Sequence, residues 1–298
     1  MLSRGGRAYR FRERVFNRAN RILLPHMADP VRRETEAAGD DAMPEPMKVI
    51  DNGADTTIVS FSSAAMLHTG RPTSEFESFF QRQARPYNLV LFRDIHRSVY
   101  HLTPDGESGG LEWYRTELEN ALAALGASRH VAIGDSGGAA AAIYFGTKLG
   151  FETVVAFSPP FPMHHWISPV AQLRAYFDVP LLIKEPSAYW EHVLIAGSAT
   201  FMFYLPIGLR CGFDSIFNPI TTYLEASERP RLTIFYGEGS RPETKIIAPL
   251  RGLPDVTINP LPTAKHFCMV ALARTGRLGS TIMEAIEPLP ASGEADTA

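Results

Sequence analysis

A serine in a glycine-rich run and a histidine far downstream are the residues of this chain best suited to chemistry. Gly134-Asp135-Ser136-Gly137-Gly138 surrounds the serine with small residues, and His266 is the only histidine after residue 192. A serine hydroxyl is a poor nucleophile at neutral pH, so it needs a base within hydrogen-bond reach, and an imidazole base needs an acid that fixes its tautomer. Glu238 and Glu243 lie between the two residues and are candidates for that acid.

Other interpretations of the glycine-rich run have to be weighed. GDSGG also surrounds the nucleophile of chymotrypsin-like proteases, which are all-β and carry their histidine and aspartate before the serine. Here four alanines, Ala139–Ala142, open a helix-forming segment, and the chain has two cysteines, which excludes that class. The phosphate-binding patterns GxxxxGK[ST] and GxGxxG do not match. The interpretation of this run as a turn with no catalytic role is left open, because a bare G-x-S-x-G occurs often by chance.

The elements that must position Ser136 are a strand before it and a helix after it. Arg129–Ile133 has the composition of a short buried strand. Ala139–Leu149 consists of strong helix formers and stops at Gly150, which suits a helix C-cap. Val154–Phe157 begins the next buried strand. The sequence predicts a strand, a sharp turn at the serine and a helix.

Further strands and helices alternate on both sides of this unit. The expected strands are Thr56–Phe61, Asn88–Phe92, Arg231–Tyr236 and Val256–Leu261, and the expected helices are Leu111–Leu125, Thr244–Leu250 and Met269–Ile286. Strands that alternate with helices indicate a mostly parallel β-sheet with helices on both faces. A chain of 298 residues with 45% hydrophobic residues can bury one large core of this α/β class.

The G-x-S-x-G pattern between a strand and a helix resembles the nucleophile elbow of the α/β-hydrolases. In that superfamily the acid follows the serine after a late strand, and the histidine follows the last strand. Ser136, the carboxylates after Arg231–Tyr236, and His266 have this order. The resemblance covers about residues 55–285 and implies the α/β-hydrolase fold with an inserted lid.

The resemblance also implies which carboxylate is the acid. Relatives with a strand that ends in Tyr-Gly usually place an aspartate about six residues beyond the glycine, and Glu243 holds that position. Glu238, closer to the strand end, is the alternative, whereas Asp255 lies before the last strand at the opposite end of the sheet. The other acid position of the fold, directly after Val154–Phe157, is occupied by Ser158-Pro159-Pro160 and has no carboxylate.

Two main-chain groups would form the oxyanion hole by the same resemblance. The residue after the nucleophile supplies one N–H, and the loop after the first core strand supplies the other. Gly137 and Ala64 hold these positions, with Ser63 as a neighbour that could share the second. Ser62 stands where many relatives have a histidine.

The predicted organisation has five segments. They are an N-terminal basic helix and linker (1–50), the first part of the α/β-hydrolase core (51–158), a lid or cap insertion (159–230), the second part of the core (231–287) and a disordered tail (288–298). Arg7–Leu24 has arginines around one apolar helical face. This pattern favours a helix packed on its own domain, with an anionic membrane or a partner protein as the alternative.

The predicted lid is rich in aromatic residues. Val193–Leu209 is apolar and long enough to suggest a membrane span, but Pro206 and the small polar residues within it favour a helix that covers substrate. Its character predicts a pocket for an apolar acyl or alkyl group, or a subunit contact. His96 and His101, in the loop after the second core strand, are expected to be hydrogen-bonded loop residues rather than substrate contacts.

Composition narrows the function further. A net charge of −3 with 20% charged residues does not favour nucleic-acid binding. Two cysteines, and an N-terminus without an apolar signal region, fit a cytoplasmic protein. The adjacent His164 and His165 are poor joint metal ligands, so no metal is expected, and no organic cofactor is implied.

The sequence therefore predicts a serine hydrolase with a Ser136–Glu243–His266 triad that cleaves a small-molecule carboxylic ester or thioester. Acyl transfer or lyase chemistry on the same triad is one alternative. A non-catalytic binding protein of this fold is another. The N-terminal helix or the lid is the expected surface for a peripheral membrane or subunit contact.

Overall fold

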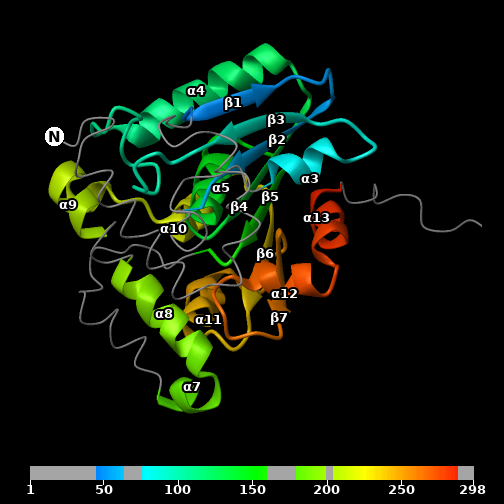
Figure 1. Ribbon diagram of the computed structural model, residues 1–298. Coiled ribbons are helices and arrows are strands. Elements are labelled where there is room, and N and C mark those ends of the chain that lie inside the picture. Colours follow the sequence, from blue (N-terminus) through cyan, green and yellow to red (C-terminus); the bar gives the residue numbers. More distant parts are fainter. Residues whose placement is uncertain (1–44, 64–75, 160–178, 199–203, 288–298) are drawn as a thin grey trace, which may run out of the picture.

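The computed structural model describes residues 45–63, 76–159, 179–198 and 204–287, and these form one twisted sheet with helices around it (Figure 1). The sheet has seven strands in the order β1-β3-β2-β4-β5-β6-β7. Its strands are β1 (Met47–Ile50), β2 (Thr56–Phe61), β3 (Asn88–Phe92), β4 (Arg129–Asp135), β5 (Thr153–Phe157), β6 (Arg231–Gly237) and β7 (Val256–Leu261). β1 runs antiparallel to β3, and all other neighbours are parallel.

The helices lie on both faces of this sheet and beyond its carboxyl edge. They are α3 (Glu77–Gln81), α4 (Gly110–Leu125), α5 (Gly137–Lys148), α7 (Val179–Lys184), α8 (Pro186–Ser198), α9 (Leu205–Cys211), α10 (Pro219–Glu225), α11 (Arg241–Ile247), α12 (Cys268–Arg274) and α13 (Leu278–Ile286). Two 3₁₀ turns occupy Phe213–Ser215 and Ala248–Leu250.

The central strands β2, β3 and β5 are buried along their whole length because both of their faces are covered. Alternate side chains point to opposite faces of a strand. Val59 and Phe61 of β2 therefore pack with α4, α5 and α10 on one face. Ile58, also on β2, packs in the cluster of α3, α12 and α13 on the other face. The expected mostly parallel sheet with helices on both faces is confirmed.

Three elements differ from the sequence-based prediction. Met47–Ile50, which that prediction assigned to the N-terminal segment, pairs with β3, so the sheet begins before residue 51. The single closing helix is two helices, α12 and α13, separated by Gly276 with a φ of 69°. α10 lies within the predicted lid, but its Ile220 and Tyr223 are buried in the main core. This helix therefore belongs to the layer that covers the sheet.

Other predicted segments fall partly or wholly outside the described residues. The basic N-terminal helix, the C-terminal tail, and His164 with His165 lie there. Within the predicted lid the structure describes α7, α8, α9 and α10. In the described part of the chain, no helix combines the length and the apolar composition that crossing a membrane requires.

The order of the strands creates a natural site at one edge of the sheet. From β2 the chain moves to β3 on one side and then to β4 on the other side of β2. At such a switch point the connections leave in opposite directions, and ligands of open α/β sheets bind at the carboxyl ends of the strands there. Ser62 follows β2 and Ser136 follows β4 at this edge.

Candidate active site

Ser136 lies on a sharp turn between β4 and α5. Its backbone has a φ of 49° and a ψ of −121°, a conformation that non-glycine residues rarely adopt. Its N–H donates a 2.9 Å hydrogen bond to the carbonyl of Phe157 on the neighbouring β5. Strain of this kind persists only where the surroundings enforce it, and it is typical of nucleophile elbows.

The glycines on either side of Ser136 are required by close packing. A Cβ on Gly134 would lie 2.2 Å from the carbonyl oxygen of Gly138. A Cβ on Gly138 would lie 2.1 Å from the carbonyl oxygen of Phe61 at the end of β2. Both distances are far below van der Waals contact. The G-x-S-x-G pattern thus has a physical cause here: the first turn of α5 rests directly on the main chains of β4 and β2.

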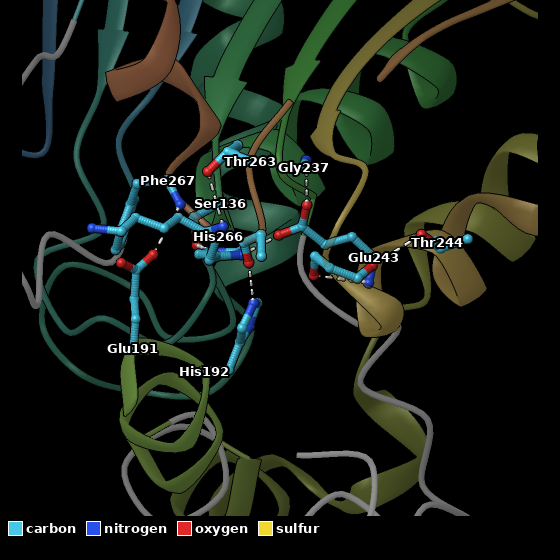
Figure 2. A network of polar contacts seen from close by, with 12 residues as sticks. Ser136, Glu191, His192, Gly237, Glu243, Thr244, Thr263, His266 and Phe267 are labelled. Carbon is cyan, nitrogen blue, oxygen red and sulfur yellow. Dashed lines mark hydrogen bonds and ion pairs between the residues drawn. The ribbon is translucent and has the colours of Figure 1, made fainter. Parts of the chain in front are cut away.

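Three side chains from three different elements meet at this turn (Figure 2). His266 Nε2 lies 2.9 Å from Ser136 Oγ, and His266 Nδ1 lies 2.8 Å from Glu243 Oε1. A carboxylate can only accept, so Nδ1 carries a proton and donates a hydrogen bond to Glu243. The lone pair of Nε2 is then free to accept the hydrogen bond from the serine hydroxyl. His266 and Glu243 are 4% and 2% exposed, so water does not compete with these bonds.

Glu243 is held in place from both ends. Its backbone follows the Ser240 cap of α11, which gives Ser240-x-x-Glu243 the form of a capping box. Its carboxylate does not bond back to the N–H of Ser240, however. Oε2 accepts a 3.0 Å hydrogen bond from the N–H of Gly237, at the end of β6, and Oε1 accepts from His266. Glu238, the alternative acid of the sequence analysis, is exposed to solvent.

The charges around His266 favour its protonated form. Burial lowers the pKa of this imidazole, but the hydrogen bond and charge of Glu243 outweigh it. The charges of Asp135 and Glu191 act in the same direction, and the pKa of His266 lies above the ordinary value of 6.5. The histidine is therefore a stronger base than a free imidazole.

Asp135, the residue before the serine, is a buried carboxyl group that the sequence analysis did not single out. Burial raises its pKa, and the neighbouring Glu243 and Glu191 add to this, although the charge of His266 opposes it. Its Oδ1 has no hydrogen-bond partner among the described residues. The sequence did contain a signal for this buried carboxyl group, because Asp135 stands at the end of the apolar strand that leads to Ser136.

One of the two predicted oxyanion donors can be placed. Gly137 is the first residue of the 12-residue α5, and the first N–H groups of a helix have no partner within it. Ala64 lies outside the described residues. Ser62, just before it, is fixed by its Oγ, which accepts a 3.1 Å hydrogen bond from the N–H of Asp94, and by its carbonyl, which accepts from the Tyr100 hydroxyl.

The two loop histidines have structural partners. His96 Nε2 lies 2.9 Å from the carbonyl of Pro104, and His101 Nδ1 lies 2.8 Å from the carbonyl of Ser98. Burial lowers the pKa of His101. Across the described residues, no group of three or more histidine, cysteine or acidic side chains is arranged to hold a metal ion.

Glu191 and His192 of α8 are further polar residues near the site that the sequence analysis missed. Figure 2 shows both side chains pointing from α8 toward the loop that carries His266. A signal was present, because Glu191 is the only acidic residue and His192 the only histidine between Pro186 and Leu209.

Comparison with known proteins finds similarity among solved structures. No family model matches the chain, and no curated protein matches it. Among solved structures, MenH from S. aureus is similar with a TM-score of 0.51 at 11% identity, over 82% of this chain and 98% of that one. A Staphylococcus aureus protein described provisionally as an esterase has a TM-score of 0.51 at 14% identity, over 87% and 91% of the two chains. MGS-M2, an α/β-hydrolase enzyme from a Medee basin deep-sea metagenome library, has a TM-score of 0.45 at 13% identity, over 82% and 96%. At such identities the likeness concerns the fold alone.

Proposed function

We propose that this chain, which has the α/β-hydrolase fold, is a serine hydrolase that cleaves a carboxylic ester or thioester with an apolar acyl or alkyl group. The observation that carries the proposal is the continuous hydrogen-bond chain from Ser136 Oγ through His266 to Glu243, at 2.9 and 2.8 Å. A base within reach of the nucleophile, and an acid that orients the base, are the geometric requirements for nucleophilic catalysis by serine.

In the first half-reaction His266 Nε2 removes the hydroxyl proton as Ser136 Oγ attacks the substrate carbonyl. The imidazolium that forms keeps its Nδ1–H hydrogen bond to Glu243, whose negative charge stabilises it. The oxygen of the tetrahedral intermediate takes the negative charge. When the intermediate collapses, His266 gives its proton to the leaving alcohol or thiol, and the acyl group stays on Ser136 as an ester.

The oxyanion is held by the N–H of Gly137 and, in this proposal, by that of Ala64. The support for Gly137 is its place at the start of α5, where the helix dipole also favours negative charge. In the second half-reaction His266 removes a proton from water, which attacks the acyl-enzyme. The second tetrahedral intermediate collapses, the bond from Ser136 Oγ to the acyl carbon breaks, and His266 returns the proton to Ser136 Oγ as the carboxylic acid leaves.

The apolar substrate class is supported by the residues of the predicted lid. Ile183 of α7, Trp190 of α8 and Leu209 of α9 are large apolar side chains that are 76%, 57% and 73% exposed. They offer contact area to an acyl or alkyl chain. A subunit or a peripheral membrane contact would use the same residues, and nucleic acid is not proposed as a partner.

The place of action that we propose is the cytoplasm. The support is a chain with two cysteines, Cys211 and Cys268, neither of which is in a disulfide. Structural disulfides persist mainly in oxidising compartments, so this cysteine usage fits a reducing one.

Hydrolysis of p-nitrophenyl esters of increasing acyl length tests the proposal. We expect kcat/KM to rise with chain length until the apolar site is filled, and Ser136→Ala to lower kcat about 10⁴-fold or more. Replacing Ser136 by alanine without any loss of activity would contradict the nucleophile assignment. Added alcohol acceptors distinguish acyl transfer from hydrolysis, because a transferase forms a new ester instead of the free acid.

A further inference from the structure

Two adjacent residues of α8 contact the catalytic-histidine loop on both sides of His266. His192 Nε2 lies 2.6 Å from the carbonyl oxygen of Ala264, two residues before the histidine. A carbonyl can only accept, so His192 donates this hydrogen bond. Glu191 Oε1 accepts a 3.3 Å hydrogen bond from the N–H of Phe267, the residue after the histidine. Figure 2 shows the two side chains straddling the loop from the α8 side.

Both polar side chains are buried, which makes the contacts specific. Glu191 and His192 are 8% and 4% exposed, whereas the preceding Trp190 is 57% exposed. A buried polar group is costly unless it is hydrogen-bonded. The buried side of α8 thus holds a carboxylate and an imidazole beside the apolar Ala188 and the aromatic Tyr189.

The loop that carries His266 lies at the edge of the sheet. It follows β7, an edge strand that pairs with β6 on one side. Its start is held by the carbonyl of Thr263, which accepts a 3.1 Å hydrogen bond from the N–H of Gly239. From Ala264 to Phe267 the chain leaves the sheet, and the two α8 contacts lie at the first and last residues of this stretch.

Glu191 also adds negative charge beside His266. The carboxylates that face the imidazole are Glu243, which bonds to it directly, Asp135 from the elbow and Glu191 from α8. Each of these charges favours the imidazolium. Removal of the Glu191 charge therefore has an electrostatic effect on His266 in addition to any change in its position.

We propose that Glu191 and His192 are positioning residues that hold the loop Ala264–Phe267 so that His266 stays between Ser136 and Glu243. The helix of the predicted lid is then part of the catalytic apparatus rather than only a cover for the substrate. This inference rests on the proposed hydrolase function for its kinetic consequences. The contacts themselves have a consequence that can be measured without turnover.

The variants for the test are Glu191→Gln, which keeps the size and removes the charge, and His192→Ala, which removes the donor. His192→Gln restores a donor to the loop. Glu185→Gln is the matched control, because it makes the same chemical change at an exposed position just before α8. The assays are kcat and KM on one p-nitrophenyl ester, the fraction of active protein, and the pH titration of His266 followed by NMR in histidine-labelled protein.

We expect kcat to fall about 10-fold in Glu191→Gln and His192→Ala, with KM within about twofold of the wild type. His192→Gln recovers part of the loss, and Glu185→Gln changes nothing. In Glu191→Gln the pKa of His266 falls, and the acidic limb of the kcat/KM profile moves to lower pH with it. A merely structural role would lower the active fraction and leave this profile in place.

Unchanged kcat and an unchanged His266 titration in both variants would overturn the proposal. So would a loss of kcat that only matches the loss of folded protein. If the wild type hydrolyses no ester, the proposed function fails, and the NMR titration alone decides. A lower His266 pKa in Glu191→Gln, but not in Glu185→Gln, then still supports the α8 contacts, and an unchanged one overturns them.

Discussion

Ser136 and His266 lie 2.9 Å apart, yet the chain holds them in two different ways. Ser136 is held by main chain. Its N–H bonds to the backbone of β5, and Gly134 and Gly138 bring the backbones of β4, α5 and β2 into direct contact. His266 is held by side chains, because Glu243 fixes its ring and α8 contacts the loop around it.

The difference suggests which part of the site can vary. The position of the nucleophile follows from the geometry of the central sheet, so most changes that displace it also damage the fold. The position of the base depends on a few side chains that come from separate elements. Substitutions there are expected to change rate and pH dependence while the fold persists.

The largest expected effect is on the side-chain-held half of the site. We expect Glu243→Gln to lower kcat about 10³- to 10⁴-fold, because an amide can donate to Nδ1 and so favour the wrong tautomer of His266. The free energy of unfolding should change far less than the rate. Steady-state kinetics and urea unfolding measure the two effects. Glu238→Gln is the control and should stay within about twofold of the wild type, since its side chain is exposed. Equal activity of Glu243→Gln and the wild type would break the comparison.

Around Ser136, which is held by main chain, we expect substitutions to affect the free energy of unfolding. Gly138→Ala places a Cβ 2.1 Å from the Phe61 carbonyl oxygen, so we expect the free energy of unfolding to fall by about 3 kcal/mol. Gly126→Ala is the control, because its φ of 62° is strained but its Cβ meets nothing within 4 Å. About 1 kcal/mol is expected for strain alone. Denaturant unfolding measures both, and a smaller loss for Gly138→Ala than for Gly126→Ala would contradict the close packing.

The pH dependence of kcat/KM sharpens the comparison, because it reports on the protonation of His266, the base that takes the serine proton. His266 must be neutral to accept the serine proton, so activity falls about tenfold per pH unit below its pKa. That pKa is raised, which places the acidic limb above pH 6.5. The raised pKa of His266 also affects the free energy of unfolding, which it increases at low pH, where activity is lost. Protonation of His266 stabilises the folded state below pH 6.5, and this contribution is lost as pH rises through the folded-state pKa. An acidic limb below pH 6.5 would show that the surrounding carboxylates do not act on His266 as described.

The smallest expected effect concerns Asp135, on the main-chain-held side. Its raised pKa means that the folded state disfavours the ionised carboxylate, so its ionisation reduces stability as pH rises above the ordinary value of 3.8. We expect Asp135→Asn to increase the free energy of unfolding at pH 8 by at least about 1 kcal/mol and to leave it nearly unchanged at pH 3. Urea unfolding at the two pH values measures this. A variant that is less stable than the wild type at both values would contradict the proposed cost of the buried charge.

The sequence was a good guide where local chemistry dictates structure. The runs Thr56–Phe61 and Val256–Leu261 are strands with the expected bounds, because turn residues limit each apolar segment. Ser136, Glu243 and His266 could be brought to one edge of the sheet because parallel strands all end there. Their hydrogen bonds agree with that placement.

The remainder depends on contacts between segments far apart in the chain. Met47–Ile50 has no pattern of its own that marks it as a strand, and its pairing with β3 is a tertiary contact. Glu191 and His192 stand out in an apolar stretch, but the loop that they contact is far away in the sequence. The two hydrogen bonds join residues that are 76 and 72 positions apart. No periodicity in the sequence encodes which buried polar groups meet.

The most direct test of the central claim is the mass of the intact protein after incubation with a fluorophosphonate, followed by mapping of the modified peptide. A serine activated by His266 attacks phosphorus, displaces fluoride and retains the phosphonyl group. We predict one adduct per chain, on Ser136, and no adduct in Ser136→Ala. The rate of adduct formation should decrease as the pH drops below the raised pKa of His266. No adduct on the folded wild type, or an adduct that persists in Ser136→Ala, would contradict the claim.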